Sequence, residues 1–575
     1  MKNNRLLIPK IFVIFLFIIL VLTSCVNNKE VKKQEKNPSF EYLNAFGGAL
    51  FDIFGRAFPL KDGTFYIVVE THSPASTGDI PKSCHFKIHD LPNISDSFDL
   101  EDCGDIWIFQ IDPRKEEGKQ IVYSRCFGGT KGERIQSVIM TEDEQIVVCG
   151  IADSDDGDLS NEPVKGSKRW IFRVDPKKKW NEQITYSNIF SPSDIDEVDD
   201  IKFVSKDIAY IYSHRKSNSG YFYNLKAIDF SKDRDNSQIF NRDIFFSDIK
   251  LIRDSSIYTK NKMVVGDNGI LTIVVSADKD HLFMPKDKNK ALNINKTISY
   301  KDNKSEDDKK IKNSENLSDI LVLSLDPKLS ESDWIVFSRF IGGNNIESTP
   351  SILKAKDGKY WISFRSNSHD GELKGVPFKN YSNLVLLKLN PNLAFDKQIE
   401  YLKYFSTINK DEHLGLYYFA KDENDNLAFL SPRVNNLTFL FQKVNRTNAK
   451  DDKNAILDNE TYDKEKNVVF PPLKKKTDQN IFEIFYLDTK KDEVFYKDLY
   501  IFGSDCCLDF CDTSSLVFAI SANNKPNVGD MPNYKMSILE NLGDWVNKNS
   551  SSDATVYSNI LVGILSIKDM KKLEK

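Results

Sequence analysis

Seven copies of one short pattern run along the chain, and this repetition constrains the fold more than any other feature. Each copy begins with an apolar residue followed by Gly or Ser, at Phe46-Gly47, Phe127-Gly128, Phe190-Ser191, Phe246-Ser247, Ile341-Gly342, Phe405-Ser406 and Phe502-Gly503. A polar turn such as Asp62-Gly63 then precedes a β-rich run, and six copies close on an apolar strand that ends in Asp or Asn. A repeat of this kind cannot bury its own apolar faces and must pack on its neighbours. Four strands per copy and seven copies predict an all-β chain, folded as a single β-propeller of seven four-stranded blades.

Two long charged insertions interrupt the repeat. One covers residues 279–316 and contains the mixed-charge run 301–310, and the other covers residues 445–479. Neither has the apolar periodicity of a helix or strand. Both are predicted to be surface loops between the third and fourth strands of their units, so that they emerge on one face of the disc. A partner-binding arm is the alternative interpretation of each.

The boundaries of the propeller follow from the repeat. We assign residues 40–575 to the propeller domain, in which strand material around Glu41–Phe46 is expected to complete the blade that ends in Ile560–Ile567. Such a closure avoids exposing the edge of an open blade. A short helix is expected near Met536–Asn547.

The first 24 residues have the pattern of an export signal. A basic start precedes the apolar run Ile11–Leu22, which is short for a membrane span. The run leads into Leu22-Thr23-Ser24-Cys25, which resembles the bacterial lipobox. The resemblance implies cleavage before Cys25 and acylation of that residue, with palmitate among the acyl groups. The alternative is an uncleaved membrane anchor or a plain secretory signal. Residues 25–39 are polar and rich in Lys and Glu, which predicts a flexible tether between the lipid and the folded body.

The net charge and the cysteine content indicate which partners and which cross-links to expect. The formal net charge is −5 over 575 residues, without a basic stripe, which argues against a nucleic-acid partner. Besides Cys25, seven cysteines remain in an exported context where disulfides persist. Cys84 and Cys103 bracket the loop of the first unit and are the expected disulfide. Connectivity cannot be deduced from the sequence alone.

Two groups of residues have the spacing of metal ligands, but each also has a simpler explanation. Asp153, Asp155, Asp156 and Asp158 have oxygen ligands spaced like those of a calcium loop, but the Glu at the twelfth position of an EF-hand is missing. We prefer a turn belonging to the repeat and keep calcium as the alternative. Cys84, His85, His89 and Cys103 have a zinc-like spacing, but the disulfide is preferred. No cofactor is therefore expected.

The known enzyme motifs are absent from the sequence. It contains no H-E-x-x-H, G-x-S-x-G, Walker A or G-x-G-x-x-G motif. The S-x-D-x-G-x-T-W boxes of sialidase-like propellers are also absent. Aromatic residues such as Trp107 and Trp170 alternate along the last strand of their units, as packing between blades requires. No catalytic residue is assigned.

One unit carries a fuller signature than the others. Ser124–Gly129, Ile146–Gly150, Asp155–Asp158 and Trp170–Asp175 together are similar to the F-G-G…D-G-G-Y-x-V-x-G…D-G-D…D-x-W-x-x-K-x-D repeats of bacterial surface and lipoprotein β-propellers. The sequence departs from that pattern at Glu144, where the family has the second Gly of D-G-G. The resemblance implies a propeller located in the cell envelope and supplies no catalytic residue to transfer.

The sequence therefore favours a lipid-anchored propeller of the bacterial cell envelope, at the outer membrane or cell surface, that acts as a non-enzymatic binding or scaffolding protein. Its expected partners are the membrane, through Cys25, and a protein or glycan of the envelope. The alternative is a hydrolase or lyase acting on polysaccharide. Such an enzyme would need two carboxylates roughly 5–10 Å apart that face one cavity.

Overall fold

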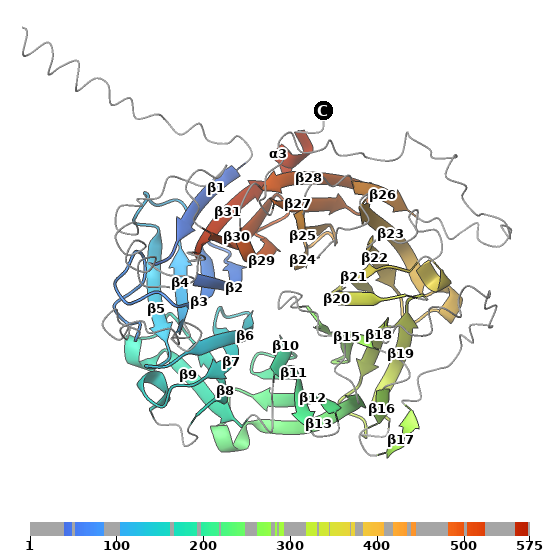
Figure 1. The fold of residues 1–575 in the computed structure, drawn as a ribbon, viewed down its shortest axis with the longest axis horizontal. Helices are drawn as coiled ribbons and strands as arrows, with labels where there is room; N and C mark the ends of the chain where they lie inside the picture. The colour runs from blue at the N-terminus through green and yellow to red at the C-terminus, as the bar shows by residue number, and fades with distance from the viewer. Residues whose placement is uncertain are drawn as a thin grey trace, which may run out of the picture.

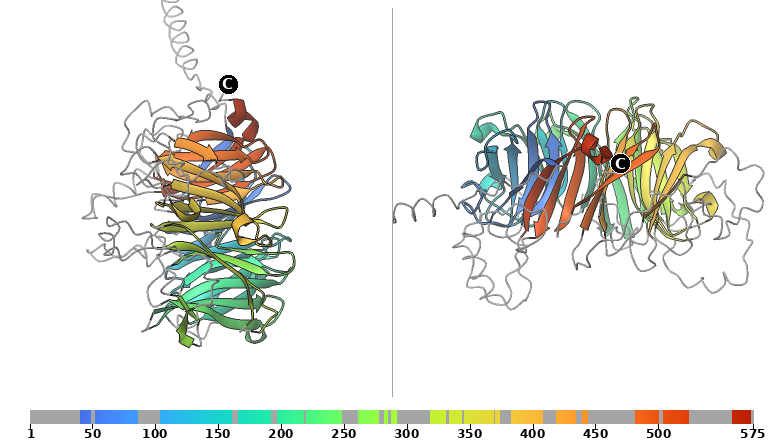
Figure 2. Two further views of the ribbon diagram at one scale, coloured as in Figure 1. Left: turned by 90° about the vertical axis from the view of Figure 1, so that its right-hand side faces the viewer. Right: turned by 90° about the horizontal axis from the view of Figure 1, so that it is seen from above.

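Seven antiparallel sheets form a ring in the computed structural model, with the first strand of each sheet nearest the centre (Figure 1). The ring is a disc when seen from its side (Figure 2). It confirms the predicted seven-bladed β-propeller. The structure describes residues 40–48, 52–85, 104–160, 166–191, 197–217, 220–247, 261–277, 282–284, 287–291, 318–330, 333–343, 345–368, 370–373, 383–407, 418–433, 439–443, 481–499, 503–523 and 558–572.

The blades follow one another along the chain, and the strands of each blade run in order from the inner to the outer one. Blade 1 contains β2 (Asp52–Pro59), β3 (Phe65–Thr71), β4 (Asp105–Ile111) and β5 (Ile121–Phe127), and blade 2 contains β6 (Glu133–Met140), β7 (Ile146–Ala152), β8 (Lys168–Val174) and β9 (Ile184–Phe190). Blade 3 contains β10 (Glu197–Phe203), β11 (Ile208–Ser217), β12 (Gly220–Asp229) and β13 (Gln238–Ser247), and blade 4 contains β14 (Met263–Val265), β15 (Leu271–Ala277), β18 (Asp319–Leu325) and β19 (Ile335–Ile341). Blade 5 contains β20 (Glu347–Lys354), β21 (Tyr360–Ser366), β22 (Asn383–Leu389) and β23 (Ile399–Thr407), and blade 6 contains β24 (Tyr418–Lys421), β25 (Leu427–Arg433), β27 (Ile481–Asp488) and β28 (Glu493–Leu499).

Blade 7 joins the two ends of the described chain. It contains β29 (Gly503–Phe510), β30 (Ser515–Asn523), β31 (Ser558–Ser566) and, as its outer strand, β1 (Phe40–Phe46). In the β1–β31 ladder, Leu43 lies opposite Gly563. The expectation that strand material around Glu41–Phe46 closes the last blade is therefore confirmed, and no edge is left open at the join.

Helices are short in the described part of the chain. The 3₁₀ turns are η3 (Gly157–Leu159), η4 (Trp180–Glu182), η5 (Arg234–Asn236), η7 (Gly371–Leu373) and η8 (Phe395–Lys397), and the α-helix is α3 (Ile567–Lys572). Among the described residues, no helix has both the length and the apolar content to cross a membrane. The helix expected near Met536–Asn547 lies outside the described residues, as do Cys25 and the rest of the first 39 residues.

The insertions leave the blades at a different point from the one predicted. The first falls between β15 and β18, and the second between β25 and β27, so both interrupt the second and third strands of a blade. The prediction of the third and fourth strands was wrong because a repeat fixes the period of the blades but not which strand is innermost. The first insertion also includes β16 (Leu282–Met284) and β17 (Asp287–Ala291), which extend the outer edge of blade 3 through the pairing of β16 with β13. The second insertion, 445–479, lies outside the described residues, and β26 (Phe439–Lys443) just before it extends blade 5.

The apolar core lies between the blades, because each sheet is covered on both faces by its neighbours. All seven residues of β8 are buried. Trp170 of this strand is fully buried, stacks on Phe172 with ring centroids 3.8 Å apart, and donates a hydrogen bond from Nε1 to Oγ of Ser187 at 3.0 Å. Its cluster includes Ile106 and Ile108 of blade 1. Trp170 therefore packs in the core between two blades, as its alternating pattern predicts.

Candidate functional site

One face of the disc contains the links between consecutive blades and the polar groups that surround them. In an antiparallel blade, the connection from the second to the third strand and the link from the outer strand to the next blade lie at the same end of the strands. We call this the insertion face, because β15 and β25, which precede the two charged insertions in the chain, end there. The tight turns that join the first two strands of each blade, such as Asp62-Gly63, lie on the opposite face.

Glu133 is the centre of a polar network between blades 1 and 2. It is the first residue of β6 and is fully buried. Its Oε2 accepts a hydrogen bond from the backbone N–H of Gly129 at 3.0 Å, and its Oε1 accepts one from the N–H of Ser154 at 3.2 Å. A methyl group built on Gly128 would overlap Oε2 of Glu133 and would lie 2.8 Å from Oδ1 of Asp105. Only glycine leaves room at this point for the two carboxyl groups.

The burial of these groups changes their acid strength. Desolvation raises the pKa of Glu133 to about 8, and the nearby charge of Asp105 acts in the same direction. Hydrogen bonds from Ser154 and Gly129 lower the pKa and offset only part of this rise. Glu133 therefore holds a proton at neutral pH, which limits the repulsion between the two neighbouring carboxyl groups.

The same network recurs between blades 4 and 5. Glu347 begins β20, and its Oε2 accepts a hydrogen bond from the N–H of Gly343 at 3.2 Å, while Oγ of Ser366 donates to Oε1 at 2.7 Å. A methyl group on Gly342 would overlap a carboxylate oxygen of Asp319, which takes the place of Asp105. Burial again raises the pKa, to about 8 for Glu347. Two blade junctions thus contain the same pair of carboxyl groups.

A third version joins blade 7 to blade 1. Asp52 begins β2 and accepts hydrogen bonds from the N–H of Gly48 at 3.0 Å and from Oγ1 of Thr71 at 2.6 Å. Burial raises its pKa to about 6. In all three junctions an acidic residue four positions after a Gly-Gly pair binds the backbone of the second glycine. The acids therefore hold the chain where it passes from one blade to the next.

A second acidic side chain supports each of the two Glu-centred turns. Asp158 accepts a hydrogen bond from the N–H of Gly128 at 3.2 Å and pairs with Arg125 at 3.0 Å. Glu372 likewise pairs with Arg339. The guanidinium group of Arg125 also lies 4.7 Å from the ring centroid of Trp180. These carboxylates are thus bound to groups of the protein itself.

The four aspartates proposed as a calcium loop bind different protein groups. Each has its own cation or hydrogen-bond donor: Asp153 pairs with Arg134, Asp155 with Lys168 at 2.8 Å, Asp156 with the N–H and hydroxyl of Thr130, and Asp158 with Arg125. They do not converge as a group of metal ligands in the described part of the chain. Their arrangement is that of a turn that closes over Gly128 and Gly129.

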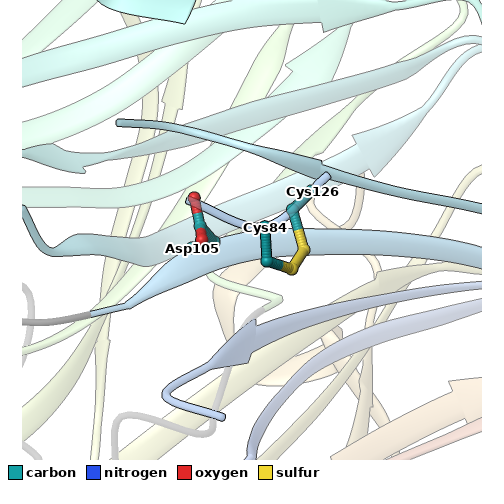
Figure 3. A group of neighbouring side chains, drawn as sticks. All are labelled: Cys84, Asp105 and Cys126. Carbon is teal, nitrogen blue, oxygen red and sulfur yellow. A yellow bond between two sulfur atoms is a disulfide. The ribbon is translucent and has the colours of Figure 1, made fainter. Parts of the chain in front are cut away.

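The disulfide differs from the one expected. Cys84 is bonded to Cys126, with Cα atoms 4.9 Å apart, so the predicted pairing with Cys103 is corrected (Figure 3). The strand register explains the change, because Cys126 lies opposite Trp107 at the end of β5 and so reaches the loop that follows β3. Cys103 itself lies outside the described residues. Cys149, Cys506, Cys507 and Cys511 are thiols.

Asp105 lies beside this disulfide (Figure 3). It also contacts His85. The backbone N–H of His85 donates to Oδ2 of Asp105 at 2.8 Å, and Nδ1 of His85 lies 3.1 Å from Oδ1. The hydrogen bond to Asp105 raises the pKa of His85. Cys84, Asp105 and Cys126 form the group of at least three metal-ligand side chains found among the described residues, with ligand atoms within 4.8 Å of one another.

Sequence reasoning missed the buried acids. Asp52, Glu133 and Glu347 each follow the second glycine of a Gly-Gly pair by four positions, a spacing visible in the sequence. A search for an acid at fixed distance after each Gly-Gly would have found them. No such signal joins His85 to Asp105, which are 20 positions apart.

Comparisons with known proteins assign no family to the chain. No protein-family model and no curated protein matches the sequence. Among solved structures, the chain is similar to a protein of unknown function from Dyadobacter fermentans (10% identity, TM-score 0.32, 92% of this chain and 98% of that one). It is also similar to the WD40 domain of SCAP from fission yeast (9%, 0.33, 92% and 97%) and to a Trypanosoma rangeli sialidase in complex with the inhibitor DANA (8%, 0.28, 93% and 59%). The fold and the blade junctions together define a β-propeller.

Proposed function

We propose that this chain is a lipid-anchored propeller of the bacterial cell envelope, at the outer membrane or cell surface, and that it binds or scaffolds a partner without catalysing a reaction. The anchor is Cys25, supported by the lipobox pattern behind the apolar run Ile11–Leu22. Several acyl chains on one cysteine bind a membrane far more firmly than a single chain, which is marginal.

The repetition of the buried acids is the observation that supports a binding or scaffolding role without catalysis. Asp52, Glu133 and Glu347 occupy equivalent positions at three blade junctions, and each accepts a hydrogen bond from a glycine N–H. A catalytic group usually occurs once and contacts a substrate site. A group that recurs by blade and binds backbone has an architectural role.

A polysaccharide hydrolase or lyase would need two carboxyl groups open to substrate. Asp105 with Glu133, and Asp319 with Glu347, are pairs contributed by neighbouring blades, but Asp105, Glu133 and Glu347 are at most 1% exposed. Gly128 lies against both carboxyl groups of the first pair, and Gly342 against both of the second. We therefore do not propose the hydrolase or lyase function.

The insertion face is the surface that we assign to the partner, a protein or glycan of the envelope. Two insertions, 279–316 and 445–479, leave the ends of β15 and β25 on this face, and propellers commonly bind partners through the loops of one face. The charged runs 301–310 and 474–476 supply both signs of charge for such a contact.

Cross-linking in intact cells, followed by isolation of the chain and mass spectrometry, tests this assignment. We expect a reproducible partner cross-linked to the wild type. Replacing residues 301–310 and 474–476 by Gly and Ser should reduce that cross-link, while an equal number of substitutions in exposed residues of the opposite-face turns should leave it unchanged. A cross-link that depends on the opposite face, or turnover of a polysaccharide by the purified protein, would contradict the proposal.

A further inference from the structure

Two sulfur atoms and a carboxylate meet at one blade junction and nowhere else in the described part of the chain. Cys84 comes from the loop after β3, Asp105 from the start of β4 and Cys126 from β5 (Figure 3). All three are buried, and their ligand atoms lie within 4.8 Å of one another. The set therefore joins three segments of blade 1.

The fold does not require sulfur at this position. Cys126 lies opposite Trp107 in the strand register, and the equivalent residues of blades 2, 4 and 5 are Ile189, Phe340 and Tyr404. Apolar and aromatic side chains thus fill the same place in those blades. Asp319 occupies the position of Asp105 at the junction of blades 4 and 5, where Phe340 replaces the cysteine. Cys126 is therefore not a residue that the blade repeat requires.

We propose that the reduced form of this site, through Cys84, Cys126 and Asp105, binds one divalent cation of the zinc class. Thiolates and a carboxylate are ligands that zinc accepts in a tetrahedral site, and the fourth position is open to a water molecule or a further donor. Two thiolates beside the carboxylate of Asp105 would concentrate negative charge at a buried site. A bound dication neutralises this buried charge.

His85 is a positioning residue for the carboxylate. It contacts both oxygens of Asp105, through its backbone N–H and its Nδ1. Hydrogen bonds of this kind fix the orientation of a metal-binding carboxylate. The His85 side chain is 29% exposed, whereas that of Asp105 is 1% exposed, so His85 also lies where a cation would enter.

The disulfide and the cation exclude each other, which makes the site sensitive to redox conditions. An external dithiol reduces the Cys84–Cys126 bond by giving two electrons and two protons to the two sulfur atoms, and it is itself oxidised to a disulfide. The cation then binds the two sulfurs as thiolates, and both thiol protons pass to water. The sulfur atoms, about 2.05 Å apart when bonded, must separate to take part in Zn–S bonds of about 2.3 Å.

The test uses the full chain, treated with a dithiol, freed of reductant under nitrogen and exposed to Zn²⁺ alone. We expect the reduced wild type to retain one zinc equivalent more than the double variant Cys84→Ser/Cys126→Ser, and the oxidised wild type to retain no more than that variant. Because all other cysteines are present in both proteins, the difference isolates this site. Co²⁺ in place of Zn²⁺ should show thiolate-to-metal charge-transfer absorption that the double variant loses.

A matched pair of variants tests the role of the carboxylate. Asp105→Asn should weaken zinc binding by about tenfold or more. Asp319→Asn changes the equivalent residue of a junction without cysteines and should bind zinc as the wild type does. Equal zinc in the reduced wild type and the folded double serine variant would overturn the proposal. Unchanged zinc binding by Asp105→Asn would show that Asp105 is not a ligand and would overturn the proposal of a site formed by Cys84, Cys126 and Asp105.

Discussion

Replacement of Trp170 by alanine is the sharpest test of packing between blades. The indole is fully buried between blades 1 and 2, stacks on Phe172 at 3.8 Å and donates a hydrogen bond to Ser187. Alanine would remove nearly all of these contacts. The ring of blades would lose packing at one of its seven junctions.

The expected cost can be worked out from the buried surface. An aromatic side chain of this kind buries about 150–250 Å², which at about 25 cal/mol per Å² corresponds to roughly 4–6 kcal/mol. Partial relaxation around the cavity brings the measured cost of a buried Trp→Ala substitution to about 3–5 kcal/mol. We therefore expect the free energy of unfolding of Trp170→Ala to fall by about 4 kcal/mol.

Thermal and denaturant unfolding, followed by near-ultraviolet circular dichroism, measure this loss. The matched control is Trp180→Ala in the same blade, because Trp180 is 52% exposed and its ring lies against the guanidinium group of Arg125. An exposed cation–π contact is worth about 0.5–1 kcal/mol, so the control should lose no more than that. Equal losses in the two variants, or an unchanged midpoint for Trp170→Ala, would refute the packing of Trp170 between blades 1 and 2.

Three further predictions concern the blade junctions. Burial raises the pKa of Glu347 from 4.5 to about 8, so its contribution to stability is complete below about pH 4.5 and is lost as the pH rises through 8. Glu347→Gln should therefore flatten the fall in thermal midpoint between about pH 4.5 and pH 8, and an unchanged pH profile would contradict this. Gly129→Ala places a methyl group 2.8 Å from the carbonyl oxygen of Asp156 and should cost about 1–3 kcal/mol in denaturant unfolding, whereas a neutral effect would show that the turn has room. Cys84→Ser removes a disulfide that spans 42 positions. The free energy of unfolding should fall by about 4 kcal/mol under oxidising conditions and change little under reducing ones. An equal loss under both conditions would mean that packing, and not the disulfide, causes the loss.

The repeat made the architecture predictable. Phe46, Phe127, Phe190 and Ile341 each end an outer strand, so the apolar residue before Gly or Ser does mark the boundary between blades. The closing strand was also predictable, since an open blade would leave an exposed edge. The location of the insertions within their blades could not be predicted, because the period of a repeat contains no information on which strand is innermost.

Some of the polar contacts could be predicted from the sequence and others could not. Glu133 follows Gly129 at the same spacing as Glu347 follows Gly343, so comparison of the repeats would have identified the buried acids. The partner of Cys84 was hidden, because it is set by the register of β5 on β4 rather than by distance along the chain. Cys103 is closer in sequence, and sequence distance favoured it wrongly.

Acylation of Cys25 is the claim on which the proposed location depends, and one measurement tests it directly. Cells that produce the wild type or Cys25→Ala are labelled with a clickable fatty acid, and the isolated chain is assayed for label in membrane and soluble fractions. We expect labelled wild type in the membrane fraction, and an unlabelled Cys25→Ala variant that is released from it. Absence of label from the wild type, or label retained by Cys25→Ala, would contradict a lipid anchor at this residue.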